Sequence, residues 1–216
     1  MKLVDLLFDR RCCICDKHID SGAVCTDCNE KIAALADVRK RRLKIGERTF
    51  EVSYLFDYDN PVVQKLLFKL KRSSNRDLFR YAGKLYFKAV PEHFRGVVTN
   101  CPRGGKGIRN YGYDQVAVPC GIMCKESDGS LEYHRLVKRI GRSKEQKNLS
   151  LEQRKENTKN KFRIAKKDIP KNILIVDDVV TTGSTVNACI LEILKCREDA
   201  DIKVACLASR NTFSGK

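Results

Sequence analysis

The chain has 216 residues, of which 42% are hydrophobic and 32% charged, so it can build a folded core and wholesale disorder is excluded. Lysine and arginine exceed aspartate and glutamate by 43 − 27 = +16, which is typical of proteins that bind polyanions or carry a solvated basic surface. No stretch approaches the roughly 18 apolar residues of a membrane helix, and charges come too early at the N-terminus for a signal peptide. We therefore expect a cytoplasmic protein without a membrane span.

Five of the eleven cysteines lie within the first 28 residues, which indicates a small metal-binding module. Four of them form a C-x2-C-x9-C-x2-C pattern, at Cys12, Cys15, Cys25 and Cys28. Two such thiolate pairs complete the tetrahedral coordination of Zn²⁺ and leave no open position, so we expect a structural zinc site. Cys13 and His18 are alternative ligands. The competing interpretation is a set of reduced, metal-free cysteines in a helical arm.

The next segments are predicted from composition and periodicity. A short helix is expected over 31–38, and the basic run Arg39–Arg42 is typical of a linker or an exposed edge. Residues 49–58 are rich in β-branched and aromatic side chains, which favours a strand or hairpin arm. One helix is expected to begin at Asp59-Asn60-Pro61 and a second to cover 77–90.

From residue 97 onward, predicted strands alternate with predicted helices, which indicates a parallel α/β sheet. The continuous apolar run Ile173–Val176 predicts a strand buried on both faces. The polar segment 143–161 is expected to form a mobile loop or a solvent-exposed helix. The other strands are expected at 97–99, 135–140 and 202–207, and the helices at 113–125 and 183–196.

The stretch I-L-I-V-D-D-V-V-T-T-G-S-T, residues 173–185, is the most informative part of the chain. The predicted strand brings Asp177 and Asp178 to the carboxyl edge of the sheet, where open α/β sheets bind ligands. The backbone N–H groups of 181–185, at the start of a helix, form a site for an anion. Carboxylates suit hydroxyl groups or hydrated Mg²⁺, so a sugar phosphate fits both ends. The alternative is that Asp178 only caps the helix and the threonines only form a turn.

This stretch resembles the phosphoribosyl-pyrophosphate (PRPP) motif of type I phosphoribosyltransferases, and nearly the whole chain resembles the ComF family of competence proteins. In that family a cysteine zinc module precedes such a domain. The family's R-x-R-G-F-N-Q element is similar to Arg109–Gln115, and its later R-x3-T-x2-Q-x2-L-x4-R-x2-N-x4-F pattern is similar to Arg139–Phe162. The departures are Tyr111 for arginine, Asp114 for asparagine and Ser143 for threonine. The loop after Val98, T-N-C-P-R-G-G-K-G, also departs from the family's proline-rich V-P-L type, which bears on catalysis more than on ligand binding.

The resemblance implies a type I phosphoribosyltransferase-like parallel sheet flanked by helices over residues 45–216, after a small four-cysteine zinc module over 1–38. Asp177 and Asp178 would accept hydrogen bonds from the ribose hydroxyls and help position Mg²⁺. The loop of Cys101–Gly105 would face pyrophosphate with Arg103 as charge partner, and the segment 142–157 would close over PRPP. The 5′-phosphate would be held by Thr181, Thr182, Gly183, Ser184 and Thr185.

Three functions are compatible with these features. The favoured one is a ComF-like protein that binds PRPP or another ribose 5-phosphate and acts in DNA uptake during natural transformation. The alternatives are an active phosphoribosyltransferase of nucleotide salvage or synthesis, and a zinc-dependent nucleic-acid-binding protein that keeps the phosphate loop as a remnant. The implied partners are single-stranded DNA, a competence helicase and other DNA-uptake proteins. A DNA surface requires that Arg39–Arg42, Lys69, Lys71, Arg72 and the segment 135–167 converge on one face.

Overall fold

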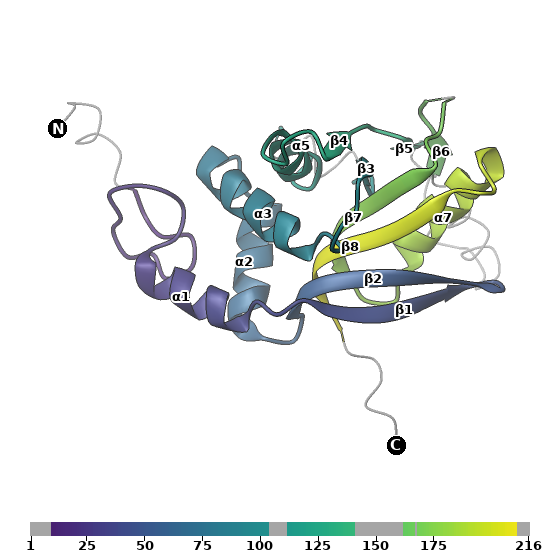
Figure 1. The fold of residues 1–216 in the computed structure, drawn as a ribbon. Helices are drawn as coiled ribbons and strands as arrows, with labels where there is room; N and C mark the ends of the chain where they lie inside the picture. Colours follow the sequence, from purple (N-terminus) through teal and green to yellow (C-terminus); the bar gives the residue numbers. More distant parts are fainter. Residues whose placement is uncertain (1–9, 104–111, 141–161, 167, 211–216) are drawn as a thin grey trace, which may run out of the picture.

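The computed structural model is built around one six-stranded sheet with the order β1-β2-β8-β7-β3-β4 (Figure 1). The hairpin of β1 (Arg39–Ile45) and β2 (Arg48–Asp57) is antiparallel, whereas every other neighbouring pair in this sheet runs parallel. The predicted mixed α/β architecture with a mostly parallel sheet is confirmed. The structure describes residues 10–103, 112–140, 162–166 and 168–210.

The remaining elements alternate along the chain. The strands are β3 (Gly96–Asn100), β4 (Leu131–Tyr133), β5 (Val137–Arg139), β6 (Phe162–Ile164), β7 (Asn172–Val180) and β8 (Asp201–Ser209). The helices are α1 (Thr26–Leu35), α2 (Pro61–Lys71), α3 (Arg76–Ala89), α5 (Ala117–Lys125) and α7 (Ser184–Cys196). None of these described helices has the length and apolarity needed to cross a bilayer.

Helices cover both faces of the sheet. Leu174 and Val176 of β7 pack in one core with α2, α3 and α5, whereas Ile173 and Ile175 pack in a second core with α7. Successive side chains of a strand point to opposite faces, so an uninterrupted apolar run is what a doubly covered strand requires. The prediction of a strand buried on both faces at 173–176 is confirmed.

Side-chain caps fix where helices begin. The side chain of Asn60 accepts from the N–H of Val62 at 2.9 Å at the start of α2, as the Asn-Pro pair predicts. Asp114 accepts from the N–H groups of Val116 and Ala117 at 3.0 and 3.1 Å, so α5 begins at residue 117 rather than 113. Local capping therefore shortens the helix that periodicity alone predicts.

Other expectations need correction. Arg39–Arg42 is not a linker but part of the edge strand β1, so the exposed-edge alternative holds. The first helix begins at Thr26 and ends before the predicted limit, because Ala36 adopts an extended conformation. The expected strand at 135–140 is only β5, which pairs with β6 outside the main sheet. The predicted loop or helix at 143–161 lies outside the described residues.

The cysteine-rich N-terminal segment packs on the main domain instead of standing apart from it. Its buried residues Ile14, Ile19 and Ile32 belong to the same core as α2 and α3. The hydroxyl of Tyr81 on α3 donates to Asn29 Oδ1 at 3.0 Å across this contact. The first segment therefore shares apolar surface with α2 and α3, and Figure 1 shows it on the side of these helices that faces away from the sheet.

Candidate functional site

The acidic pair, Asp177 and Asp178, lies in the last part of β7, beyond the point where pairing with β3 ends. Pairing of β7 with β3 ends at Val176 and Asn100, whereas pairing with β8 continues to Val180. The chain after β3 stays close, because the N–H of Cys101 donates to the carbonyl of Val176 at 2.9 Å. The pair therefore faces the loop that follows β3, at the carboxyl edge of the sheet.

Strand alternation turns the two carboxylates toward opposite faces. Asp178 Oδ2 lies 3.3 Å from Lys71 Nζ, at the end of α2. Asp177 Oδ1 accepts from the N–H of Asp178 at 2.9 Å, and the Asp177 side chain also contacts the thiol of Cys101. The two residues thus have different neighbours and different electrostatic environments.

The two carboxyl groups also differ in charge. Burial raises the pKa of Asp177 to about 8, and the charge of Asp178 adds to the effect, while the Asp178 N–H, the Cys101 thiol and Lys71 oppose it. Asp177 is therefore mostly protonated at pH 7. Asp178 instead makes an ion pair with Lys71.

The phosphate loop, residues 181–185, is held in place by contacts with the edge strand β1. Arg41 Nη2 donates to the carbonyls of Val180 and Thr181, each at 3.0 Å. Gly183 has φ +74°, and a Cβ built on it would lie 2.7 Å from Leu43 Cδ1. Glycine is therefore required here by backbone conformation and by close packing. With the loop carbonyls engaged by Arg41, the N–H groups at the start of α7 are the groups available to an anion.

The other predicted loop residues lie around this turn. Thr182, Ser184 and Thr185 are exposed, Thr181 is partly buried and Gly183 is buried. Thr182 Oγ1 accepts from the N–H of Ser184 at 3.4 Å, which closes the turn into α7. These five residues follow the acidic pair directly, so one short segment of β7 and α7 brings carboxyl groups and anion-binding groups together.

Arg103, the predicted pyrophosphate partner, lies beside the end of α2. Its Nη1 donates to Gln115 Oε1 and, at 3.4 Å, to the carbonyl of Lys71. It thus ties the loop after β3 to the residue that pairs with Asp178. Gly104 and Gly105 lie outside the described residues.

Three residues of this site carry no signal in the sequence that assigns them to it. Arg41 and Lys71 are part of the general basic charge, and only the fold brings them to the phosphate loop and to Asp178. Tyr86 lies in the C-terminal part of α3 and is fully buried, and its hydroxyl has no hydrogen-bond partner among the described residues. Burial, and next the charge of Asp178, raises the pKa of Tyr86, so its O–H proton is retained near the acidic pair.

The four predicted cysteine ligands converge at the N-terminus. The Sγ atoms of Cys12, Cys15, Cys25 and Cys28 all lie within 4.8 Å of one another. Tetrahedral Zn²⁺ with bonds of about 2.3 Å requires S–S separations of about 3.8 Å, close to the 3.6 Å between Cys15 and Cys25. The cluster can therefore bind a metal such as zinc. Cys13 and His18, the alternative ligands, are not part of it.

The backbone around Cys12 favours its thiolate. Burial disfavours ionisation of Cys12, but the N–H groups of Cys15, Cys25 and Ile14 outweigh it and lower its pKa to about 6. Burial raises the pKa of the neighbouring Cys13 to about 12, with the charge of Cys12 as the second cause. Of these two adjacent cysteines, Cys12 is a metal-ligand candidate and Cys13 is a partly buried, protonated thiol.

Comparison with known proteins agrees with the α/β part of this arrangement. Residues 117–213 match the phosphoribosyl transferase domain family. The chain is 26% identical over 186 residues to "Competence protein F" of Haemophilus influenzae, covering 82% of this chain and 80% of the relative. Together with the four-cysteine cluster in front of the domain, these matches support a ComF-like protein.

Two solved structures are also similar to the ComF-like chain. The orotate phosphoribosyltransferase of Aeropyrum pernix is 17% identical, with a TM-score of 0.38, over 86% of this chain and 81% of that one. A hypoxanthine phosphoribosyltransferase of Staphylococcus aureus is 14% identical, with a TM-score of 0.31. That match covers 68% of this chain and 65%, just under two thirds, of the other.

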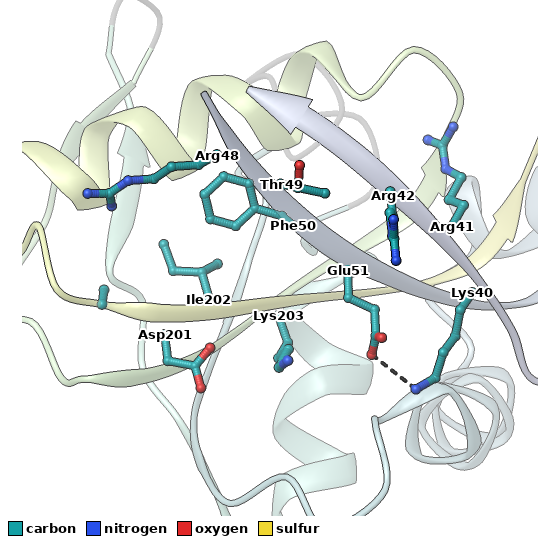
Figure 2. A pocket seen from close by; sticks show the side chains of 11 residues that line it. Lys40, Arg41, Arg42, Arg48, Thr49, Phe50, Glu51, Asp201, Ile202 and Lys203 are labelled. Carbon is teal, nitrogen blue, oxygen red and sulfur yellow. Dashed lines mark ion pairs between the residues drawn. The ribbon is translucent and has the colours of Figure 1, made fainter. Parts of the chain in front are cut away.

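A basic groove of about 640 Å³ lies across the β1–β2 hairpin and the start of β8 in the ComF-like protein (Figure 2). Three of its cations are occupied. Lys40 pairs with Glu51 at 3.2 Å, Arg48 donates to the carbonyl of Glu198 at 2.8 Å, and Arg41 donates to the carbonyls of Val180 and Thr181. Its basic residues are Lys40, Arg41, Arg42, Arg48 and Lys203, against the acidic Glu51 and Asp201. Of the predicted DNA surface, only Lys40, Arg41 and Arg42 therefore line this groove.

Proposed function

We propose that the ComF-like protein binds a ribose 5-phosphate such as PRPP. The 5′-phosphate would occupy the loop of Thr181–Thr185, and the ribose hydroxyls would face Asp177 and Asp178. The supporting observation is that Arg41 engages two loop carbonyls from behind, which leaves N–H groups for the phosphate next to the acidic pair. Asp178 is the hydrogen-bond acceptor for a hydroxyl, and protonated Asp177 can also donate.

Calorimetry with ribose 5-phosphate and with inorganic phosphate tests this proposal. Wild-type protein should bind the sugar phosphate at least tenfold more tightly than phosphate, because only the sugar reaches the carboxyl groups. Asp178→Asn should weaken sugar-phosphate binding and leave phosphate binding unchanged, while Asp199→Asn, an exposed change, should alter neither. Equal affinities for the two ligands in wild-type protein would refute the proposal.

We propose that the zinc ion is structural and that residues 1–38 and 45–216 are the two functional units. Four thiol ligands fill a tetrahedral site, so no position remains for a substrate. With PRPP, Mg²⁺ would arrive bound to the pyrophosphate, and Arg103 would be a charge partner of the pyrophosphate oxygens. The reduced thiols expected in this chain suit a cytoplasmic location.

A role in DNA uptake is the favoured biological function and is supported by the similarity to competence protein F. Single-stranded DNA is the proposed polyanion, and a competence helicase and other uptake proteins are the proposed partners. The basic groove offers two cations, Arg42 and Lys203, that make no ion pair within the described part of the chain. They are therefore free to meet phosphodiester groups.

Fluorescence titration with single-stranded DNA at several salt concentrations tests the groove. Each cation lost from a phosphate contact should reduce the slope of log affinity against log salt by about 0.7. Arg42→Gln with Lys203→Gln should thus lower it by about 1.4, while Lys84→Gln with Lys88→Gln on α3 should not change it. An unchanged slope in the groove variant would assign the DNA to another surface.

The second candidate function is active phosphoribosyl transfer, favoured by the match of residues 117–213 to the phosphoribosyl transferase domain family. An active enzyme releases pyrophosphate from PRPP when the correct acceptor base is present. A coupled pyrophosphate assay across the nucleobases, with Asp178→Asn as the inactive control, separates this candidate from binding alone.

A further inference from the structure

The acidic pair of this chain already has a cation in contact with it. Lys71 is the last residue of α2, and its Nζ lies 3.3 Å from Asp178 Oδ2. Asp178 is only 13% exposed, so this ion pair is shielded from solvent more than a surface pair is. The ammonium group therefore balances the charge of this carboxylate.

The position of Lys71 is fixed by its surroundings. Leu67 and Leu70, in the same helical turn, are almost fully buried in the core between α2 and the sheet. The carbonyl of Lys71 accepts from Arg103 Nη1 at 3.4 Å, which joins the end of α2 to the loop after β3. Lys71 is thus anchored by its helix and by its own backbone, and its side chain extends to Asp178.

A divalent cation at the same carboxylate would have to displace this ammonium or lie beside it. Mg²⁺ binds proteins through one or two carboxylates and keeps several water molecules in a strict octahedron. A lysine ammonium at hydrogen-bond range of Asp178 occupies one of those oxygens and repels a second cation. The lysine leaves the other carboxylate oxygen available for a ribose hydroxyl.

We propose that Lys71 is the built-in cation of the acidic pair, so that this chain holds a ribose 5-phosphate without a divalent metal. Lys71 is a positioning residue, since its ion pair holds Asp178 in the orientation that faces the hydroxyls. The proposal rests on the proposed sugar-phosphate site and adds how the charge of that site is balanced.

Calorimetry with ribose 5-phosphate, in EDTA and in Mg²⁺, gives the first test. Wild-type affinity should agree within twofold in the two buffers. Lys71→Met should bind at least tenfold more weakly in EDTA and recover in Mg²⁺, Lys71→Arg should remain independent of the metal, and Lys65→Met, an exposed change on α2, should behave as wild type. Wild-type binding that requires Mg²⁺, or an unaffected Lys71→Met, would overturn the proposal.

Titration with Mn²⁺ in the absence of sugar, followed by electron paramagnetic resonance, gives the second test. Removing the ammonium frees Asp178, so Lys71→Met should bind Mn²⁺ at least fivefold more tightly than wild type, and Lys71→Arg should not. Equal Mn²⁺ affinities for wild type and Lys71→Met would overturn the role of Lys71. This readout does not depend on sugar binding, so a failure of the sugar-phosphate proposal in the calorimetry is distinguishable from a failure here.

Discussion

The cysteine cluster and the sugar-phosphate site are built on opposite principles. All four thiols come from residues 12–28, held by one short bridge between Arg11 and His18 and by the start of α1. The sugar-phosphate site combines β1, α2, the loop after β3 and β7, and Arg41 reaches a carbonyl 140 residues further along the chain. The first site therefore depends on local spacing and a metal, and the second depends on the completed sheet.

The largest expected effect comes from breaking the local site. Cys25→Ser removes one of four ligands from a module whose folding gains on the order of 10 kcal/mol from zinc. Because Ile14 and Ile32 share a core with α2 and α3, the loss should lower the Tm of the whole chain by about 10 °C. Metal analysis should find about one zinc in wild type and none in the variant.

The matched control for this change is Cys196→Ser, at an exposed cysteine at the end of α7. It should keep both the zinc and the Tm. A Cys25→Ser protein with a full complement of zinc would show that the four thiols are not the ligands.

An intermediate effect is expected at the contact between β1 and the phosphate loop. Gly183→Ala imposes a left-handed conformation at about 1–2 kcal/mol and places a Cβ against Leu43. Phosphate affinity should fall about tenfold, which corresponds to about 1.4 kcal/mol. Adding Leu43→Ala should restore a part of it by removing the contact but not the strain.

Gly46→Ala separates the effect of backbone strain from the effect of the contact with Leu43. Gly46 has φ +60° and no atom within 4 Å of a built Cβ, so the variant carries strain without a contact. It should lower the Tm and leave phosphate binding intact. If the double variant at Leu43 and Gly183 bound phosphate no better than Gly183→Ala, the contact between Leu43 and the phosphate loop would not influence phosphate binding.

The smallest effect concerns the pH dependence of stability. The pKa of Asp177 is raised from 3.8 to about 8, so the folded protein keeps a proton that the unfolded chain releases above about pH 4. The stabilisation is full below pH 4 and is lost as pH rises through 8. Asp177→Asn cannot ionise, so its Tm relative to wild type should rise between pH 5 and pH 8.

Thermal unfolding of wild type, Asp177→Asn and Asp199→Asn at pH 5, 6.5 and 8 measures this difference. The exposed Asp199 should give a constant offset. A constant offset for Asp177→Asn as well would mean that its carboxyl group ionises normally in the folded protein.

The same contrast explains what the sequence could predict. The four cysteines and the stretch from Ile173 to Thr185 were predictable because spacing, strand and helix start lie within a few residues. β4 and β6, each of three residues, are too short for periodicity to indicate. Lys71 and Arg41 were not assigned to the site, because only long-range strand and helix packing brings them to Asp178 and to the loop. The opposite orientations of Asp177 and Asp178 likewise depend on β7 continuing past them to Val180.

The pairing of β2 with β8 also determines when the sheet can be completed during synthesis. Val52 lies opposite Val204, so the partners are 204 − 52 = 152 residues apart. At about 5–20 residues per second, a nascent β1–β2 hairpin waits roughly 8–30 s for its central neighbour. Through that interval the long edge of β2 is unpaired and open to strands of other chains. The cysteine segment, complete by residue 28, can fold while the sheet is still being made.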